Sequence, residues 1–170
     1  LIEGTLKSSY DEKTLKKIFN ELNKFNFNWV EEPIEPSEMN KLLFIKSISK
    51  NSIATGEAYS GLTHFKNLLN PNYIDIIQYD YTHSGDFNTC FEISKIAKRN
   101  NIDQVLHVWG SSLALHSNAI FSLINKKIKF FELPSVSFEL SKDISSANYS
   151  IENGYLNFDH DFLGTGVIAP

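Results

Sequence analysis

Short apolar runs rich in Ile, Val, Phe and Tyr alternate along the chain with longer segments that show helical periodicity. In the segment 11–25, four apolar residues fall on one helical face: Leu15, Ile18, Phe19 and Leu22. Runs such as IDIIQYD at 74–80 instead have the length and composition of a buried strand. This alternation is typical of consecutive βα units on a parallel sheet, so the pattern predicts an α/β fold.

The pattern predicts six strands and five intervening helices. The strands are expected at 1–6, 27–31, 52–57, 74–80, 104–107 and 128–132. The helices are expected at 11–25, from the cap-like Ser37 onward, at 61–69, 87–99 and 112–125. After Pro134 the pattern weakens, with a turn expected at Asn153–Gly154, and nothing indicates a second domain within residues 1–170.

A closed (β/α)8 barrel needs eight strands, and an open array of six leaves two long edges unpaired. We therefore expect the C-terminal portion of a TIM-like barrel, with about six strands present and the first barrel strands absent. The chain begins at Leu1 and its single methionine is Met39, so it is either processed or a piece of a longer protein.

The composition of the chain limits the kinds of partner that it can bind. The 170 residues are 42% hydrophobic and 13% aromatic, enough for one sizeable core. The net charge of −4, with no basic run longer than Lys126–Lys127, argues against nucleic acid and a polybasic membrane anchor. The single cysteine, Cys90, excludes an internal disulfide framework. No signal peptide or membrane-length apolar run is found, so we expect a cytoplasmic protein with a small soluble partner.

Five chemically reactive side chains end successive predicted strands: Glu31, Glu57, Asp80, His107 and Glu132. The first four are separated by 26, 23 and 27 residues, about one βα unit each. In parallel α/β folds the C-terminal strand ends form the active face. Two carboxylates in one cavity suit a hard cation such as Mg²⁺, and an Asp beside a His fixes the tautomer of the ring.

Simpler interpretations remain open for the same residues. In WVEEPIEP at 29–36, the adjacent carboxylates of Glu31 and Glu32 need compensation by a cation, by a basic side chain or by solvent at a strand end. Asp80 and His107 could form a purely structural hydrogen bond. Trp29 is expected in the core.

The motifs WVEEPI, IATGEAYSG, IIQYDYTHSG, VLHVWGSSLAL and FFELP occur in this order, and with them nearly the whole chain resembles the C-terminal barrel domain of the enolase superfamily. Within that superfamily it resembles the mandelate racemase and muconate lactonizing enzyme group, which includes acid-sugar dehydratases. This resemblance implies that Glu31 and Glu57 bind Mg²⁺, that His107 is the acid/base and that Asp80 is its partner. Glu132 matches the carboxylate that contacts the substrate or intermediate.

The implied reaction is Mg²⁺-assisted removal of a proton α to a carboxylate, followed by dehydration of a sugar acid or related hydroxy acid. If active, the protein would be a carbon–oxygen lyase; racemisation or epimerisation through the same enediolate is the alternative. The substrate would be a small hydroxy-carboxylate, and the resemblance implies a homo-oligomer. Glu32 matches a neighbour of the ligand and is expected to turn toward the rim of the cavity.

The sequence departs from the family at the third metal ligand. An Asp is expected one βα unit before Glu31, but Thr5 occupies that position and Lys7 stands two residues later. Fewer carboxylates weaken metal binding, and the Lys7 ammonium could replace the charge of the metal. The family's capping domain and lysine strand are also missing, so a non-catalytic barrel remnant is a further alternative.

Overall fold

The structure is a computed structural model that describes residues 2–3, 10–135 and 149–158. Six parallel strands form one sheet, and a hairpin follows near the C-terminal end of the described chain. The sheet strands are β1 (Ile2–Glu3), β2 (Trp29–Glu31), β3 (Ser52–Thr55), β4 (Ile76–Tyr79), β5 (Asp103–Leu106) and β6 (Ile128–Phe131). The helices are α1 (Glu12–Leu22), α2 (Lys41–Ile48), α3 (Leu62–Leu68), α4 (Tyr81–Ser84), α5 (Phe87–Arg99) and α6 (Ser112–Ile124), with a 3-10 turn at Pro36–Glu38.

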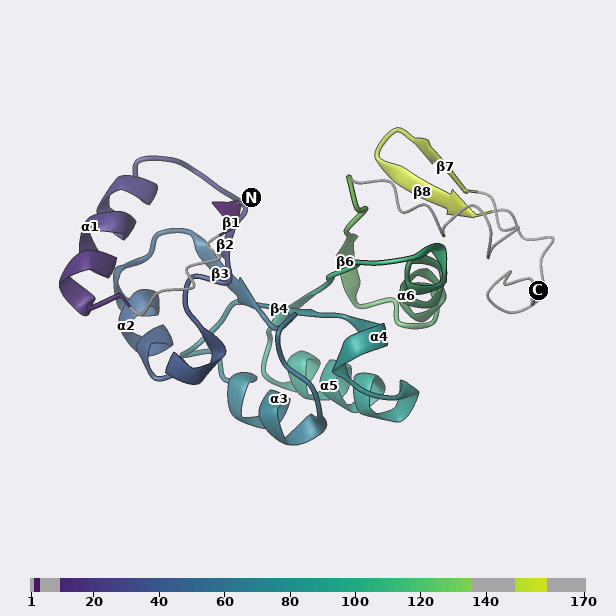
Figure 1. Ribbon diagram of the computed structural model, residues 1–170, viewed down its shortest axis with the longest axis horizontal. Helices are drawn as coiled ribbons and strands as arrows, with labels where there is room; N and C mark the ends of the chain where they lie inside the picture. The colour runs from purple at the N-terminus through teal and green to yellow at the C-terminus, as the bar shows by residue number, and fades with distance from the viewer. Residues whose placement is uncertain (1, 4–9, 136–148, 159–170) are drawn as a thin grey trace.

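The strands lie in the sheet in their order along the chain, from β1 to β6. Figure 1 shows the longer helices following one another along one side of the sheet, so that sheet and helices form an arc. Within the described residues β1 and β6 are the two edges and do not pair with each other. Parallel strands that lie side by side in their chain order, each joined to the next through a helix, are the arrangement of a partial (β/α)8 barrel. This confirms the predicted fold class.

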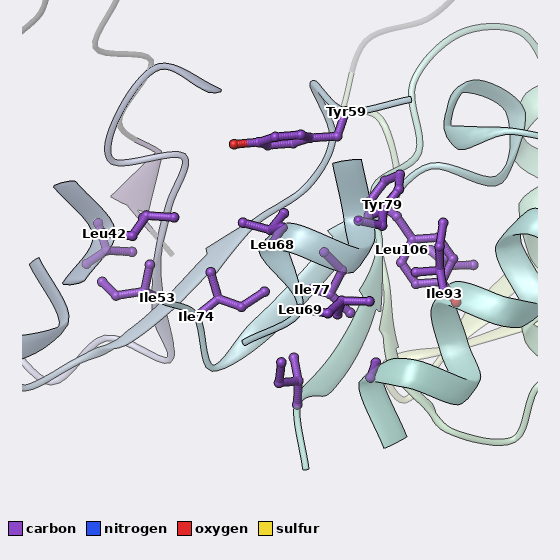
Figure 2. Close-up of a cluster of buried hydrophobic side chains, with 14 of the residues drawn as sticks. Leu42, Ile53, Tyr59, Leu68, Leu69, Ile74, Ile77, Tyr79, Ile93 and Leu106 are labelled. Atoms are coloured by element: carbon purple, nitrogen blue, oxygen red, sulfur yellow. The ribbon is translucent and has the colours of Figure 1, made fainter. Parts of the chain in front are cut away.

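The main core lies between the sheet and the helices. Figure 2 shows Leu42 of α2 beside Ile53 of β3, and Ile93 of α5 near Leu106 of β5. Tyr79 of β4 is the largest fully buried side chain, and its hydroxyl donates to Gln104 at 3.2 Å. Alternate residues of β2 to β5 therefore supply this layer, as the two-residue period of a strand requires.

The other face of the sheet carries a second, smaller apolar cluster. Trp29, Ala54, Ile76 and Val105 come from four adjacent strands and are all buried. The ring of Phe130, on β6, lies 5.9 Å from the ring of Trp29 yet is 55% exposed. This face corresponds to the interior of the barrel. Side chains two residues further along the same strands share this face and point toward a cavity at the strand ends.

Most predicted elements are confirmed to within a few residues, and α5 matches its predicted range. Asp11 and Asp86 begin α1 and α5 by accepting hydrogen bonds from the backbone N–H groups of Thr14 and Thr89. The prediction that Ser37 caps a helix is wrong, because Pro36 starts a 3-10 turn and α2 begins only after Asn40. No helix in the described part of the chain has the length and apolarity to cross a membrane.

One short helix and one hairpin were not predicted. The short helix α4 begins directly after β4, where Asp80 caps it. The hairpin formed by β7 (Tyr149–Glu152) and β8 (Tyr155–Phe158) turns at the predicted position, with Asn153 at φ 54° and Gly154 at φ 79°. Positive φ at both central residues is what a tight two-residue hairpin turn needs, which explains the Asn-Gly pair.

Candidate active site

A cavity of about 580 Å³ lies at the C-terminal ends of the strands. Four of the five predicted site residues line it: Glu31, Glu57, His107 and Glu132. The remaining wall includes Val108, Trp109, Leu133, Pro134 and Ser135. The fifth predicted residue, Asp80, is buried behind His107. The structure therefore brings all five together, although only Glu31 lies within its strand and the others come one or two residues after theirs.

The imidazole ring of His107 bridges two carboxylates. Its Nδ1 lies 3.3 Å from Oδ2 of Asp80, and its Nε2 lies 3.2 Å from Oε2 of Glu57. Burial opposes a charge on the ring, but the hydrogen bond to Asp80 and the negative charges of Glu57 and Glu132 outweigh it, so the pKa of His107 is raised. A ring that donates from both nitrogens is an imidazolium. This geometry therefore favours the protonated form of His107.

Asp80 is held as a carboxylate by a set of donors. Its Oδ1 accepts from the backbone N–H of Thr82 at 2.8 Å, the Thr82 hydroxyl at 2.7 Å and the side-chain amide of Asn118 at 3.0 Å. Burial would raise the pKa of Asp80, but these hydrogen bonds and the one from His107 lower it. Because Oδ1 is occupied, Oδ2 remains for His107 Nδ1, and a neutral ring would keep its proton on Nδ1.

Glu31 is oriented by its own strand. Residues two apart on a strand share a face, and the indole N–H of Trp29 donates to Oε2 of Glu31 at 2.9 Å. Trp29 is buried in the inner cluster, as expected, and it also fixes one oxygen of the candidate ligand. Glu31 is itself only 5% exposed. The hydrogen bond from Trp29 thus orients this carboxylate, which lines the cavity.

The expectation that Glu32 turns to the rim is wrong. Its carboxylate is buried, and Oε1 accepts from the Thr55 hydroxyl at 2.6 Å and the Gly56 backbone N–H at 2.7 Å. Glu32 follows Glu31 directly, so its side chain lies on the opposite face of the sheet, and its φ of 40° is uncommon for a residue other than glycine. Burial raises the pKa of Glu32. The two adjacent carboxylates are therefore separated by the sheet backbone.

Gly56 follows β3 and turns the chain so that Glu57 reaches the cavity. Its φ is 145°, and a Cβ atom there would lie 2.9 Å from the carbonyl oxygen of Gln78 on the neighbouring strand. A side chain does not fit without displacing that backbone. Glu32, which binds the Gly56 N–H, thus helps to set the position of Glu57.

Glu132 follows β6 and Glu57 follows β3, so the two carboxylates reach the cavity from strands that are not neighbours. The side-chain amide of Gln78 donates to its Oε1. Burial and the negative charges of Glu31 and Glu57 together raise the pKa of Glu132 to about 7, although the charge of His107 opposes the shift. Glu132 can therefore exchange a proton near neutral pH.

Nearly the whole chain matches a known family model. Residues 6–167 match the model described as "Enolase C-terminal domain-like". The chain belongs to this family. The matched range includes all five strand ends that carry the candidate site residues.

Relatives of this enolase-like chain are distant in sequence. D-galactarolactone cycloisomerase from Agrobacterium fabrum is 26% identical over 91 residues, which are 54% of this chain and 24% of that protein. L-talarate/galactarate dehydratase from Salmonella typhimurium is 23% identical over 114 residues, or 67% of this chain and 28% of that protein. The chain thus spans about a quarter of the length of the curated relatives that it matches.

A solved structure supports the same fold. The crystal structure of the 3,6-anhydro-D-galactonate cycloisomerase from Zobellia galactanivorans superposes with a TM-score of 0.81 at 26% identity. The match covers 94% of this chain and 45% of that one. The arc of six strands therefore corresponds to a little under half of a larger enolase-like protein.

The donor set suits a hard cation only in part. Enolase-superfamily sites are known to combine a Lys or His base with Mg²⁺. Glu31 and Glu57 offer oxygen ligands to one cavity, and their charges contribute to the raised pKa of Glu132, a repulsion that a cation would relieve. Among the described residues, however, no three His, Cys, Asp or Glu side chains are grouped as a metal site. Thr5 and Lys7 lie outside the described residues.

The sequence interpretation missed the residues that orient the site. Gln78 precedes Asp80 by two residues and shares its face, so strand periodicity could have identified it. Asn118, by contrast, reaches Asp80 from a helix 38 residues later in the chain. No local pattern marks it, because asparagine inside a helix has many ordinary explanations.

Proposed function

We propose that this chain is the C-terminal barrel part of an enzyme that removes the proton α to a carboxylate of an acid sugar, and that the first barrel strands and a capping domain come from sequence outside these residues. The observation that carries the proposal is the linked set of Asp80, His107 and Glu57 at a cavity that Glu132 also lines. The family membership and the distant dehydratase and cycloisomerase relatives support it.

In the proposed mechanism His107 is the acid/base. Asp80 keeps the ring oriented and stabilises its positive charge, and Nε2 faces the cavity as the atom that takes or delivers the proton. Glu132, with a pKa of about 7, supplies or accepts a second proton on another side of the substrate.

Glu31 and Glu57 are the residues that would hold Mg²⁺. The bound cation would stabilise negative charge on the substrate carboxylate as the α-proton leaves. Within the protein, Trp29 orients Glu31, while Glu32 and Gly56 set the position of Glu57.

The step after proton removal distinguishes two candidate reactions. Loss of a hydroxyl group from the neighbouring carbon releases water and gives a 2-keto-3-deoxy acid, the dehydration that the motifs indicate. Departure of a ring oxygen from that carbon instead opens a lactone or anhydro ring and gives an isomer. The matches to two cycloisomerases favour the second as the alternative.

The test is a product screen. The protein would be incubated with Mg²⁺ and a panel of aldonic acids, aldaric acids and their lactones, and proton NMR would monitor the products. Dehydration of at least one acid sugar supports the leading proposal, and ring opening without loss of water supports the alternative. Failure of every substrate, in the full-length protein, favours the non-catalytic remnant.

A further inference from the structure

Asn118 occupies an unusual position for a helical asparagine. It lies in the middle of α6, its side chain is fully buried, and α6 packs against the short helix α4 that Asp80 begins. Helix α6 comes after the strand that leads to His107, whereas Asp80 ends the preceding strand. Asn118 therefore connects the βα unit of His107 with the residue that contacts the His107 ring.

The hydrogen bonds of Asn118 fix which way its amide points. Its Oδ1 accepts from the backbone N–H of Tyr81 at 2.9 Å, and its Nδ2 donates to Asp80 Oδ1 and to the Ala114 carbonyl, both at 3.0 Å. Both amide hydrogens are used. Rotation of the amide by half a turn would place the NH₂ group against the Tyr81 N–H and leave Asp80 facing an oxygen. The amide is thus a preset donor to Asp80.

The Asn118 amide determines which carboxylate oxygen of Asp80 contacts the His107 ring. Thr82 also donates to Oδ1, but it lies two residues from Asp80 and moves with the same backbone. Asn118 provides an anchor from a different element, so it restricts rotation of the carboxylate about its own side-chain bonds. With Oδ1 held, Oδ2 is directed to Nδ1 of His107 at 3.3 Å.

We propose that Asn118 is a positioning residue that, through Asp80, keeps the neutral His107 ring in the Nδ1–H tautomer, with the Nε2 lone pair facing the cavity, against the competing carboxylate of Glu57 at 3.2 Å from Nε2. The positioning itself is a property of this chain. Its consequence for catalysis rests on the proposed function, because only the Nε2 lone pair can then take a proton from a substrate.

The tautomer can be measured without a substrate. Nitrogen-15 NMR of labelled histidine side chains distinguishes the two neutral tautomers, and a His107→Gln variant assigns the signals of His107 among the five histidines. Spectra are taken at a pH where the His107 shifts have reached their plateau. In the wild type we expect the Nδ1–H form to dominate. Asn118→Leu keeps the side-chain volume but has no donor, so the ratio of the Nδ1–H to the Nε2–H tautomer should fall about fivefold. That factor corresponds to the free energy of one ordinary hydrogen bond.

Asn125 provides a matched control. It ends α6, is also buried, and donates to the Ser94 hydroxyl at 2.7 Å, in a network separate from Asp80. Asn125→Leu should lower stability and leave the His107 tautomer unchanged. Backbone amide spectra verify the fold of each variant, and Asn118→Ala replaces the Leu variant if the latter does not give a native spectrum.

An unchanged tautomer ratio in a folded Asn118 variant overturns the proposal. An equal change in Asn125→Leu also overturns it, because the effect would then come from general loosening of α6. If the enzyme is active, kcat of Asn118→Leu should fall about tenfold with little change in KM, since Asp80 lies behind the cavity wall. A failed acid-sugar screen with a positive tautomer result would contradict the proposed function alone.

Discussion

His107 Nε2 lies 3.2 Å from Glu57 Oε2, so the candidate base and a candidate metal ligand contact each other directly. When His107 is protonated on both nitrogens, its positive charge compensates the negative charge of Glu57. A cation bound by Glu57 would supply the same compensation and weaken the hold of His107 on its second proton. The two sites, acid/base and metal, are therefore electrostatically linked through one pair of atoms.

This link predicts a Mg²⁺ titration. Calorimetry should show saturable Mg²⁺ binding that is lost in Glu57→Gln, because the amide removes an anionic ligand. Binding should also release protons from His107, seen as a heat that varies with the ionisation enthalpy of the buffer. Glu92→Gln is the control, since Glu92 is a half-buried partner of Lys95 on α5, away from the cavity lining. Wild-type protein that binds no Mg²⁺ would favour Lys7 as the replacement charge.

The second prediction concerns the acid/base. Glutamine at position 107 retains polarity and cannot exchange a proton, so His107→Gln should lower kcat by roughly 10²- to 10⁴-fold on any substrate found. Substrate affinity should change little. His64→Gln provides the comparison, because His64 is an exposed residue of α3. Equal activity of the two variants would remove His107 from the mechanism.

The third prediction is the pH dependence of stability. Burial and nearby charge raise the pKa of Glu132 from 4.5 in the unfolded chain to about 7. Between these values the folded protein binds more protons than the unfolded chain, so the free energy of unfolding should fall as pH rises. Glu132→Gln should reduce this fall, measured by urea denaturation from pH 4 to 8. Part of the fall should remain, because the raised pKa of His107 acts in the same direction.

A variant whose stability declines as steeply as the wild type across that range would contradict the buried, repelled state of Glu132. Asp80 acts oppositely, since its lowered pKa favours the folded protein and this contribution is lost as the pH falls through the folded value. The Glu132 effect should therefore appear in the neutral range and the Asp80 effect only in acid.

The fourth prediction tests the buried Glu32. Replacement by Leu leaves the Gly56 N–H and the Thr55 hydroxyl without their acceptor, which should cost about 1–3 kcal/mol of unfolding free energy. Glu32→Gln keeps an acceptor oxygen and should cost less. Denaturant melts of the two variants check the order. Equal losses would mean that the charge of Glu32, and not its hydrogen bonds, supports the strand.

The fold and the positions of the candidate site residues could be predicted from the sequence. Both depend on the periodicity of apolar residues and on the number of residues between successive strand ends. Strand ends recur once per βα unit, so Glu31, Glu57 and His107 could be assigned to one edge without coordinates. The register of adjacent strands then brings Glu31 and Ala54 side by side, which places the cavity at that edge.

The orientation of those side chains could not be obtained in the same way. Glu32 accepts a hydrogen bond from Thr55 because the register of β2 and β3 places the two residues side by side, and its positive φ is not favoured by its amino-acid type. Asn118 contacts Asp80 only because α6 packs on α4, a tertiary relationship between elements of different βα units. Similarly, Pro36 produced a 3-10 turn where the cap-like Ser37 predicted a helix start.

The most direct test of the central claim is exchange of the substrate α-proton with solvent. The full-length protein would be incubated in D₂O with Mg²⁺ and each acid sugar or lactone, and proton NMR would monitor the α-hydrogen. We predict His107-dependent loss of that signal, by exchange or by product formation, in the wild type and its absence in His107→Gln. An α-hydrogen that persists in the wild type, or disappears equally fast in the variant, would contradict the account.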